Sequence, residues 1–127
     1  MIRLTLPHPP GVNNLFLNVR HGRVMTPRYR AWKMEAAATL HEQLGLSRPF
    51  IERFEATFTF TRQSRRRTDL DGLAKAAMDA IVMAAVVVDD SLCERLVLQW
   101  AEGVKKGAEM VVEVRPWTSA DITVETA

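Results

Sequence analysis

Hydrophobic residues at every second position predict the strands of this chain. Residues 1–6 alternate apolar and polar side chains, which is typical of a short strand with one buried face. The clearest alternation covers residues 54–61, where Phe and Ala alternate with Glu and Thr. Weaker alternation predicts strands over 91–103 and 110–115, with the intervening segment 103–107 forming a hairpin turn.

A second hairpin and a first helix are predicted between residues 15 and 44. The sequence Arg-His-Gly at 20–22 is typical of a turn, and it could join two short strands within 15–25. Thr26 and Pro27 then supply a capping hydroxyl and a proline at the first helical position. The helix should run to about Leu44 and end at Gly45. Its core-facing stripe would be Trp32, Ala36, Leu40 and Leu44.

The hydrophobic period changes again after residue 69. Apolar residues spaced by three and four positions predict a helix of about 15 residues that begins near Leu70. Thr68 or Asp69 is its natural N-cap. The three β-branched residues at 86–88 should leave the helix and turn toward the acidic pair that follows.

Length and composition favour an ordinary globular domain. The chain has 127 residues, of which 47% are hydrophobic, so 1–127 is expected to form one domain with a real core. The polar segment 117–127 could be a loose tail. Prolines interrupt the N-terminus before a signal peptide could form, and the longest apolar run, 80–88, is too short to span a bilayer. With a single cysteine, we expect a cytoplasmic protein without a disulfide or a membrane segment.

The charge is divided unevenly along the chain. Residues 1–68 contain 12 Lys and Arg against 4 Asp and Glu, whereas residues 69–127 contain 5 against 11. A basic half next to an acidic half suggests a surface for a polyanion beside a site for cations. Alternatively, the two halves attract each other within the fold or across a dimer. Three cations, Arg28, Arg30 and Lys33, crowd the start of the first helix, where a bound anion would relieve their conflict with the helix dipole.

The candidate chemistry lies in residues 65–90. Three arginines are followed by two aspartates, one lysine, an apolar run and two further aspartates. Carboxylates are hard ligands suited to Mg²⁺ or Mn²⁺, and such a metal could activate water and neutralise a phosphoryl group. The lysine could stabilise the transition state. These residues are Arg65, Arg66, Arg67, Asp69, Asp71, Lys75, Asp89 and Asp90.

Each of these residues also has a simpler interpretation. Asp69 could only cap the helix, and the pair Asp89–Asp90 could only form a turn. Asp71, Lys75 and Asp79 follow one another at intervals of four, so they could form a surface ladder of ion pairs worth tenths of a kcal/mol. The residue pattern alone leaves both interpretations open.

The stretch RRRTDLDGLAKAAMDAIVMAAVVVDD resembles the central signature of the RusA family of Holliday junction resolvases, D-L-D-N-x-x-K-x-x-x-D-A-(apolar)-D-D. The segment LPHPPGVNN at 6–14, TPRYRAW at 26–32 and the C-terminal Lys-Lys-Gly turn resemble flanking motifs of that family. The resemblance covers most of residues 1–115. The sequence departs from the signature at Gly72, where the family usually has Asn.

The resemblance implies a single α/β (α+β) domain with a mixed β-sheet packed with two main helices, in a homodimer. It implies a Mg²⁺-dependent endonuclease of bacteria, phages or prophages that places paired symmetric nicks in four-way junction DNA, with Mn²⁺ as a substitute metal. The catalytic residues would be Asp69, Asp71, Lys75 and Asp90, with Asp89 as a supporting metal ligand. It implies no membrane association and no small organic cofactor.

Phosphate contacts would dominate the affinity for DNA. The candidates are Asn13, Asn14, Arg28, Arg30, Lys33, Arg65, Arg66 and Arg67. Two other functions stay open from the sequence: a homologue that binds DNA or junctions without cutting, which Gly72 makes conceivable, and an interaction protein whose acidic half binds its own basic half.

Overall fold

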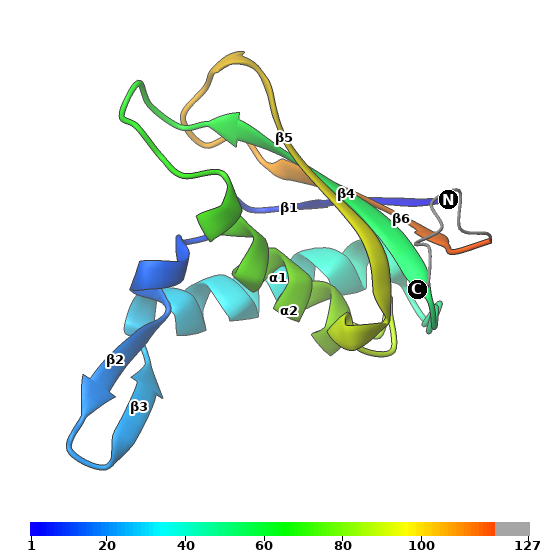
Figure 1. Ribbon diagram of the computed structural model, residues 1–127, viewed down its shortest axis with the longest axis horizontal. Coiled ribbons are helices and arrows are strands. Elements are labelled where there is room, and N and C mark those ends of the chain that lie inside the picture. The colour runs from blue at the N-terminus through cyan, green and yellow to red at the C-terminus, as the bar shows by residue number, and fades with distance from the viewer. Residues whose placement is uncertain (119–127) are drawn as a thin grey trace, which may run out of the picture.

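Four strands form one mixed sheet, and two helices cover one of its faces (Figure 1). The computed structural model describes residues 1–118. The strand order is β1-β6-β4-β5, in which β4 pairs with β5 in parallel and with β6 antiparallel. This confirms the α+β class with two main helices. With η marking a short 3-10 helix, the elements are β1 (Ile2–Leu6), η1 (Val12–Asn14), β2 (Phe16–Val19), β3 (Gly22–Met25), α1 (Pro27–Leu44), β4 (Phe54–Arg62), η2 (Asp71–Leu73), α2 (Ala74–Met83), η3 (Asp90–Leu92), β5 (Cys93–Val104) and β6 (Met110–Pro116).

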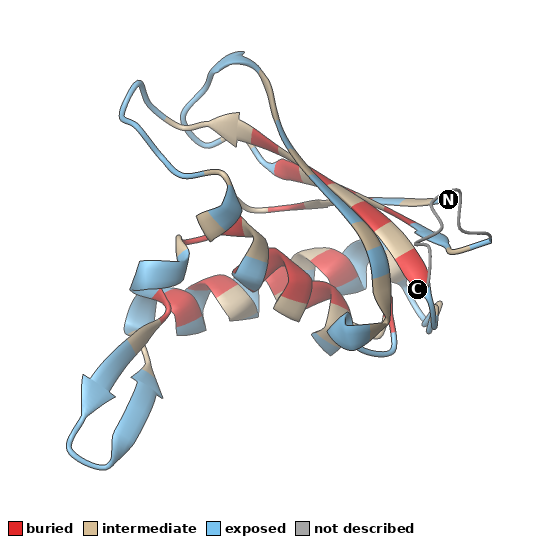
Figure 2. Cartoon of the chain, viewed as in Figure 1, coloured by how far each residue is buried: buried red, intermediate tan, exposed pale blue. Residues whose placement is uncertain are grey.

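The central strand β4 is also the segment with the strictest alternation. Its Phe54, Phe58 and Phe60 side chains are fully buried against the helices, whereas the Glu and Thr residues between them face away (Figure 2). Burying one such phenylalanine contributes about 1.5–3 kcal/mol. Helix α2 lies close to α1, and the α2 side of the core is built mainly from small residues. These are Ala76, Ala77 and Ala80, together with Met78 and Ile81.

Helix α1 begins and ends where the sequence predicts. The Thr26 hydroxyl oxygen accepts a hydrogen bond from the Tyr29 N–H at 3.1 Å, and the same hydroxyl donates to the Asn14 carbonyl at 2.7 Å. Gly45 ends the helix with a φ of 59°, a left-handed value that glycine adopts without a steric penalty. Thr26 therefore joins η1 to the first turn of α1.

The predicted hairpin at 15–25 is present as β2 and β3, which project away from the sheet and helices (Figure 1). Gly22 at its turn has a φ of 135°, which favours glycine. Leu17 and Val24 are direct cross-strand partners and are about half exposed. At the base of the hairpin, the Phe16 ring packs edge-on against Tyr29 of α1 at a centroid distance of 5.8 Å.

The second helix is shorter than predicted and lacks the predicted cap. The chain first makes the 3-10 turn η2, and only Ala74–Met83 is α-helical. The positions that precede η2 and α2 are occupied by Leu70 and Leu73, neither of which makes a side-chain capping bond. The expectation that Thr68 or Asp69 caps the helix is therefore wrong, because the tight η2 turn intervenes between them and the first α-helical residue.

The predicted hairpin between the last two strands is also wrong. Strand β4 lies between β5 and β6, so segment 103–107 passes around the end of β4. The Lys105 N–H donates to the Arg62 carbonyl at 2.8 Å, and the Gln63 side chain accepts from the Gly107 N–H at 2.8 Å. Alternation locates the strands but does not say which of them are neighbours.

Part of the expected loose tail falls within the described residues. The Trp117 N–H donates to the Arg53 carbonyl at 2.9 Å, and the Arg95 guanidinium lies 5.2 Å from the centre of the Trp117 ring. The rest of that expectation, residues 119–127, lies outside the described residues. Between residues 1 and 118, no helix is both long and apolar enough to cross a membrane.

Replacing Thr26 with alanine should lower the free energy of unfolding by about 1 kcal/mol, because it removes the cap of α1 and the bond to Asn14. Urea titration measures the change. Thr39→Ala is the matched control, since the Thr39 hydroxyl donates only to the Glu35 carbonyl of its own helix. Equal stability of the two variants would contradict the capping role.

Candidate active site

The two acidic pairs lie at opposite ends of the unit formed by β4, α2 and β5. Strands β4 and β5 are parallel and begin side by side, with Phe54 next to Cys93. The chain must therefore return along α2 from the end of β4 to the start of β5. Asp69 and Asp71 follow the end of β4, whereas Asp89 and Asp90 precede the start of β5 (Figure 1).

This separation bears on the proposed metal site. Helix α2 has ten residues, which corresponds to a length of about 15 Å. Metal–carboxylate bonds are only about 2.0–2.6 Å long, so carboxylates that far apart do not share an ion. Accordingly, residues 1–118 of one chain contain no group of three or more His, Cys, Asp or Glu side chains placed to hold a metal.

Asp69 and Asp71 instead line one cavity together with η1. Both aspartates are exposed, and Asn13 and Asn14 line the same cavity. The sequence singled out these residues separately, and the fold brings them together. Carboxylate and amide oxygens are ligands of the kind that Mg²⁺ accepts, and both line this cavity. The complete lining is Gly11, Val12, Asn13, Asn14, Thr68, Asp69, Asp71, Gly72 and Leu73.

Gly72 is not required by the space around it. A Cβ atom at this position would meet the Val12 side chain at 3.7 Å, an ordinary van der Waals contact, and the residue has no left-handed φ. The backbone would therefore accept the asparagine that is typical of the RusA signature. Compared with the RusA signature, the cavity has no side-chain amide at position 72, and the aspartates have no asparagine there that could hydrogen-bond to them.

Lys75 is held by a carboxylate that lies further along α2. Its ammonium lies 3.1 Å from Asp79 Oδ1, and the Tyr29 hydroxyl donates to Asp79 Oδ2 at 3.0 Å. Burial, followed by the hydrogen bond and charge of Asp79, raises the pKa of Tyr29. Asp79 therefore links α1 to Lys75. The i, i+4 spacing in the sequence gives the Lys75–Asp79 pair, but nothing local predicts the bond to Tyr29.

Asp89 has a structural role, whereas Asp90 is free to meet a ligand. The Asp89 side chain caps η3 by accepting hydrogen bonds from the backbone N–H and the hydroxyl of Ser91. These bonds, led by the one from the hydroxyl, lower the pKa of Asp89. Asp90 is the first residue of η3 and is exposed. The turn thus fixes the backbone that presents Asp90.

A second cavity adjoins the aspartates and is basic. Arg28 of α1 and Arg66 and Arg67 of the loop after β4 line it. It shares part of its wall, including Asn14 and Thr68, with the cavity of Asp69 and Asp71. Arg30, Lys33 and Arg65 do not line it, although Arg30 and Arg65 are exposed nearby in sequence and the Lys33 ammonium lies 5.2 Å from the centre of the Tyr29 ring.

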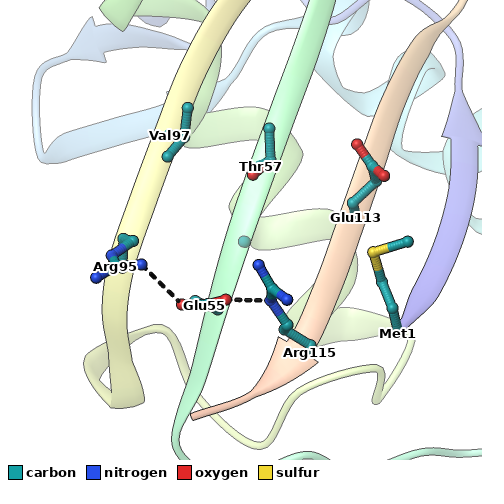
Figure 3. Close-up of a pocket in the computed structure, with 8 residues that line it drawn as sticks. Met1, Glu55, Thr57, Arg95, Val97, Glu113 and Arg115 are labelled. Atoms are coloured by element: carbon teal, nitrogen blue, oxygen red, sulfur yellow. Dashed lines mark hydrogen bonds and ion pairs between the residues drawn. The ribbon is translucent and has the colours of Figure 1, made fainter. Parts of the chain in front are cut away.

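The sheet face that lacks helices carries a cavity of a different kind (Figure 3). Its cations Arg95 and Arg115 both pair with Glu55, the first at 3.4 Å. An incoming anion would have to break these pairs. The cations of this cavity are therefore less available to a polyanion than Arg28, Arg66 and Arg67 of the basic cavity.

An exposed aspartate pair beside a basic cavity on a small α+β domain defines a protein suited to a metal ion and a phosphate chain. The family model described as Endodeoxyribonuclease RusA matches residues 7–115. The crossover junction endodeoxyribonuclease RusA of Escherichia coli strain K12 is 32% identical over 91 residues, which cover 69% of this chain and 72% of that protein. The protein of the same name from Shigella sonnei strain Ss046 is 31% identical over 91 residues, with the same coverage. The chain belongs to the RusA endodeoxyribonuclease family, as its motifs indicate.

The Tyr29–Asp79 bond predicts an unusual titration. Tyr29 is the only tyrosine, so the ultraviolet absorbance of tyrosinate reports on it alone. Because its pKa is raised in the folded protein, ionisation should begin only above the ordinary value of about 10. In Asp79→Asn the pKa should fall, since the neighbouring negative charge is removed while burial remains. A wild-type titration like that of free tyrosine would contradict the bond.

Proposed function

We propose that this protein is a Mg²⁺-dependent endonuclease, active also with Mn²⁺, that resolves four-way DNA junctions by paired symmetric nicks. The observation that carries the proposal is the shared wall between the cavity of Asp69 and Asp71 and the basic cavity. A phosphate chain bound along the basic cavity would pass over the aspartates. Membership of the RusA family supports the same substrate, which we infer the protein meets in the cytoplasm.

The active site in this proposal is shared by two copies of the chain. Asp69 and Asp71 alone are few ligands for an ion, and Asp90 lies at the other end of α2. A two-fold axis near the middle of α2 would place Asp69 and Asp71 of one copy beside the second acidic pair of its partner. Each homodimer would then hold two sites, one for each strand to be cut.

The roles of the side chains follow from their positions. Asp69, Asp71 and Asp90 would hold the divalent ion, which would lower the pKa of a bound water and neutralise charge on the phosphate. Asp89 keeps the η3 turn in place, so that Asp90 is presented to the ion. Lys75, one helical turn after Asp71, stabilises the negative charge that develops on the phosphate oxygens.

Phosphate contacts would hold the junction against this site. The proposed contacts come from three segments: η1, the first turns of α1 and the loop after β4. Because the arginines and the lysine among these residues neutralise phosphates, affinity should fall steeply with salt. The residues are Asn13, Asn14, Arg28, Arg30, Lys33, Arg65, Arg66 and Arg67.

A second candidate function is binding of junctions without cleavage. It is favoured by Gly72, which leaves the aspartates without the amide of the RusA signature. In that case the basic cavity would still bind the phosphate chain, and the aspartates would have no catalytic role.

The purified protein should nick a synthetic four-way junction symmetrically with Mg²⁺ and leave it uncut with EDTA, while a linear duplex of the same sequences stays intact. Denaturing gels of end-labelled strands show the nicks. Binding without nicks in either Mg²⁺ or Mn²⁺ would establish the second function in place of the first.

Asp71→Asn should reduce cleavage at least about 1000-fold, because it removes a metal ligand, while junction affinity stays within about threefold. Fluorescence anisotropy measures the affinity. Glu42→Gln, an exposed change of the same chemistry on α1, is the control and should have no effect. Loss of binding together with cleavage would count against Asp71 as a ligand.

A further inference from the structure

The basic cavity has the features of a seat for a single phosphate. We propose that His8, Arg28, Arg66 and Arg67 bind one backbone phosphate of the DNA strand that is cut, next to the phosphate over Asp69 and Asp71. The proposal rests on the proposed function, to which it adds His8 and a fixed position for the strand. The cavity is lined by His8, Pro9, Gly11, Asn14, Arg28, Gln63, Ser64, Arg66, Arg67, Thr68 and Leu73.

The cations of this cavity have no ion-pair partner within the described part of the chain. No Asp or Glu lines the cavity, and neither Arg28, Arg66 nor Arg67 takes part in an ion pair among residues 1–118. Three guanidinium groups around an acid-free hollow repel one another, and a bound anion removes that repulsion. The ion pairs of this part of the chain lie elsewhere, at Arg53, Lys75, Arg95 and Arg115.

His8 adds a buried polar atom that lacks a partner. Its Nδ1 is buried without a hydrogen bond, and its ring is fixed edge-on against Phe60 at a centroid distance of 6.4 Å. Burial, and then the charge of Arg28, lowers the pKa of His8, so the imidazole is neutral and carries one N–H donor. Because His8 lines the cavity, we assign its imidazole N–H as a donor to an oxygen of the bound phosphate.

The loop that carries the two arginines is held in place before any ligand arrives. The Gln63 amide donates to the carbonyls of Thr61 at 2.9 Å and Ala108 at 3.1 Å. The Arg66 N–H donates to the Ser64 hydroxyl at 3.2 Å. On the opposite side, Arg28 lies in the first turn of α1, where the helix dipole favours an anion over a cation. The seat is thus partly ordered in advance, which lowers the entropy cost of binding.

The position of the basic cavity suggests a role in selecting the phosphodiester that is hydrolysed. It shares Gly11, Asn14, Thr68 and Leu73 with the cavity of the aspartates, so the two hollows lie side by side. A phosphate seated among the arginines would leave its neighbour along the strand over Asp69 and Asp71. The seat would therefore act as a positioning site that sets which phosphodiester is hydrolysed.

The test combines junctions in which one phosphate is uncharged with protein variants in which one residue of the cavity is changed. Each phosphate around the branch point of the junction is replaced in turn by an uncharged methylphosphonate, and junction affinity is measured by anisotropy in EDTA. In the wild type, one position should weaken binding about tenfold. In Arg28→Gln the affinity for unmodified junction should fall by a similar factor, and the salt slope by about one. The same methylphosphonate should then have little further effect, because both changes remove one contact.

Two controls separate this seat from general electrostatics. Arg3→Gln removes an exposed cation on β1 outside both cavities and should leave the methylphosphonate pattern unchanged. His8→Gln keeps a hydrogen-bond donor and should retain the sensitivity to methylphosphonate at that position. His8→Leu should reduce this sensitivity and distribute the nicks over several neighbouring phosphodiesters. The seat is refuted if no position couples to Arg28, if Arg3→Gln has the same effect, or if the protein does not bind the junction.

Cleavage of the unmodified junction by the wild type, measured in parallel, tests the proposed function separately. If the coupling to Arg28 is found without any cleavage, the phosphate seat stands and the nuclease proposal fails. If the protein cleaves the junction but no methylphosphonate position couples to Arg28, the nuclease proposal stands and the phosphate seat fails.

Discussion

The parallel pairing of β4 with β5 is the constraint on which the rest of the molecule depends. It forces the chain to cross back over the sheet along α2, whose buried residues share one core with the phenylalanines of β4. The same crossover puts the segment after β4 and the segment before β5 at opposite ends of the unit. Residues that are neighbours in the RusA signature are thereby separated in space, and the site we propose from all of them would use a second copy of the chain.

The fold places the cations of the two halves of the sequence in different surroundings. Cations of the first half, such as Arg28 and Arg66, surround an acid-free cavity beside Asp69 and Asp71. Cations of the second half are mostly neutralised, as Arg95 and Arg115 are by Glu55. The halves therefore do not simply cancel each other within one chain. Positive charge stays available where a phosphate chain would meet the aspartates, which agrees with a nuclease better than with an interaction protein closed on itself.

Features set by local sequence were predicted well. The bounds of α1 follow from Thr26 and Gly45, whose effects act over one helical turn, and β4 follows from its strict alternation. The errors concern which elements are neighbours in the fold. Alternation does not reveal that β4 separates β5 from β6, and a capping residue next to a helical pattern does not exclude an intervening turn such as η2.

The candidate site shows the same division. Motif spacing identified Asp69, Asp71 and the arginines, because these lie close together in the chain. It missed the Tyr29–Asp79 bond and the place of His8 beside Arg28, which join segments 20 to 50 residues apart. Nor does spacing say whether two acidic pairs meet within one chain, because that depends on whether the strands around α2 are parallel.

The shared active site is tested most directly by mixing two inactive variants. Asp71→Asn and Asp90→Asn are given different affinity tags, refolded together, and the heterodimer is isolated through both tags before junction cleavage is measured with Mg²⁺. If each site combines Asp71 of one copy with Asp90 of the other, the heterodimer holds one site with both changes and one intact site. It should then nick the junction, while neither homodimer does. A heterodimer as inactive as its parents would show that each site is built within one chain, and would contradict the account.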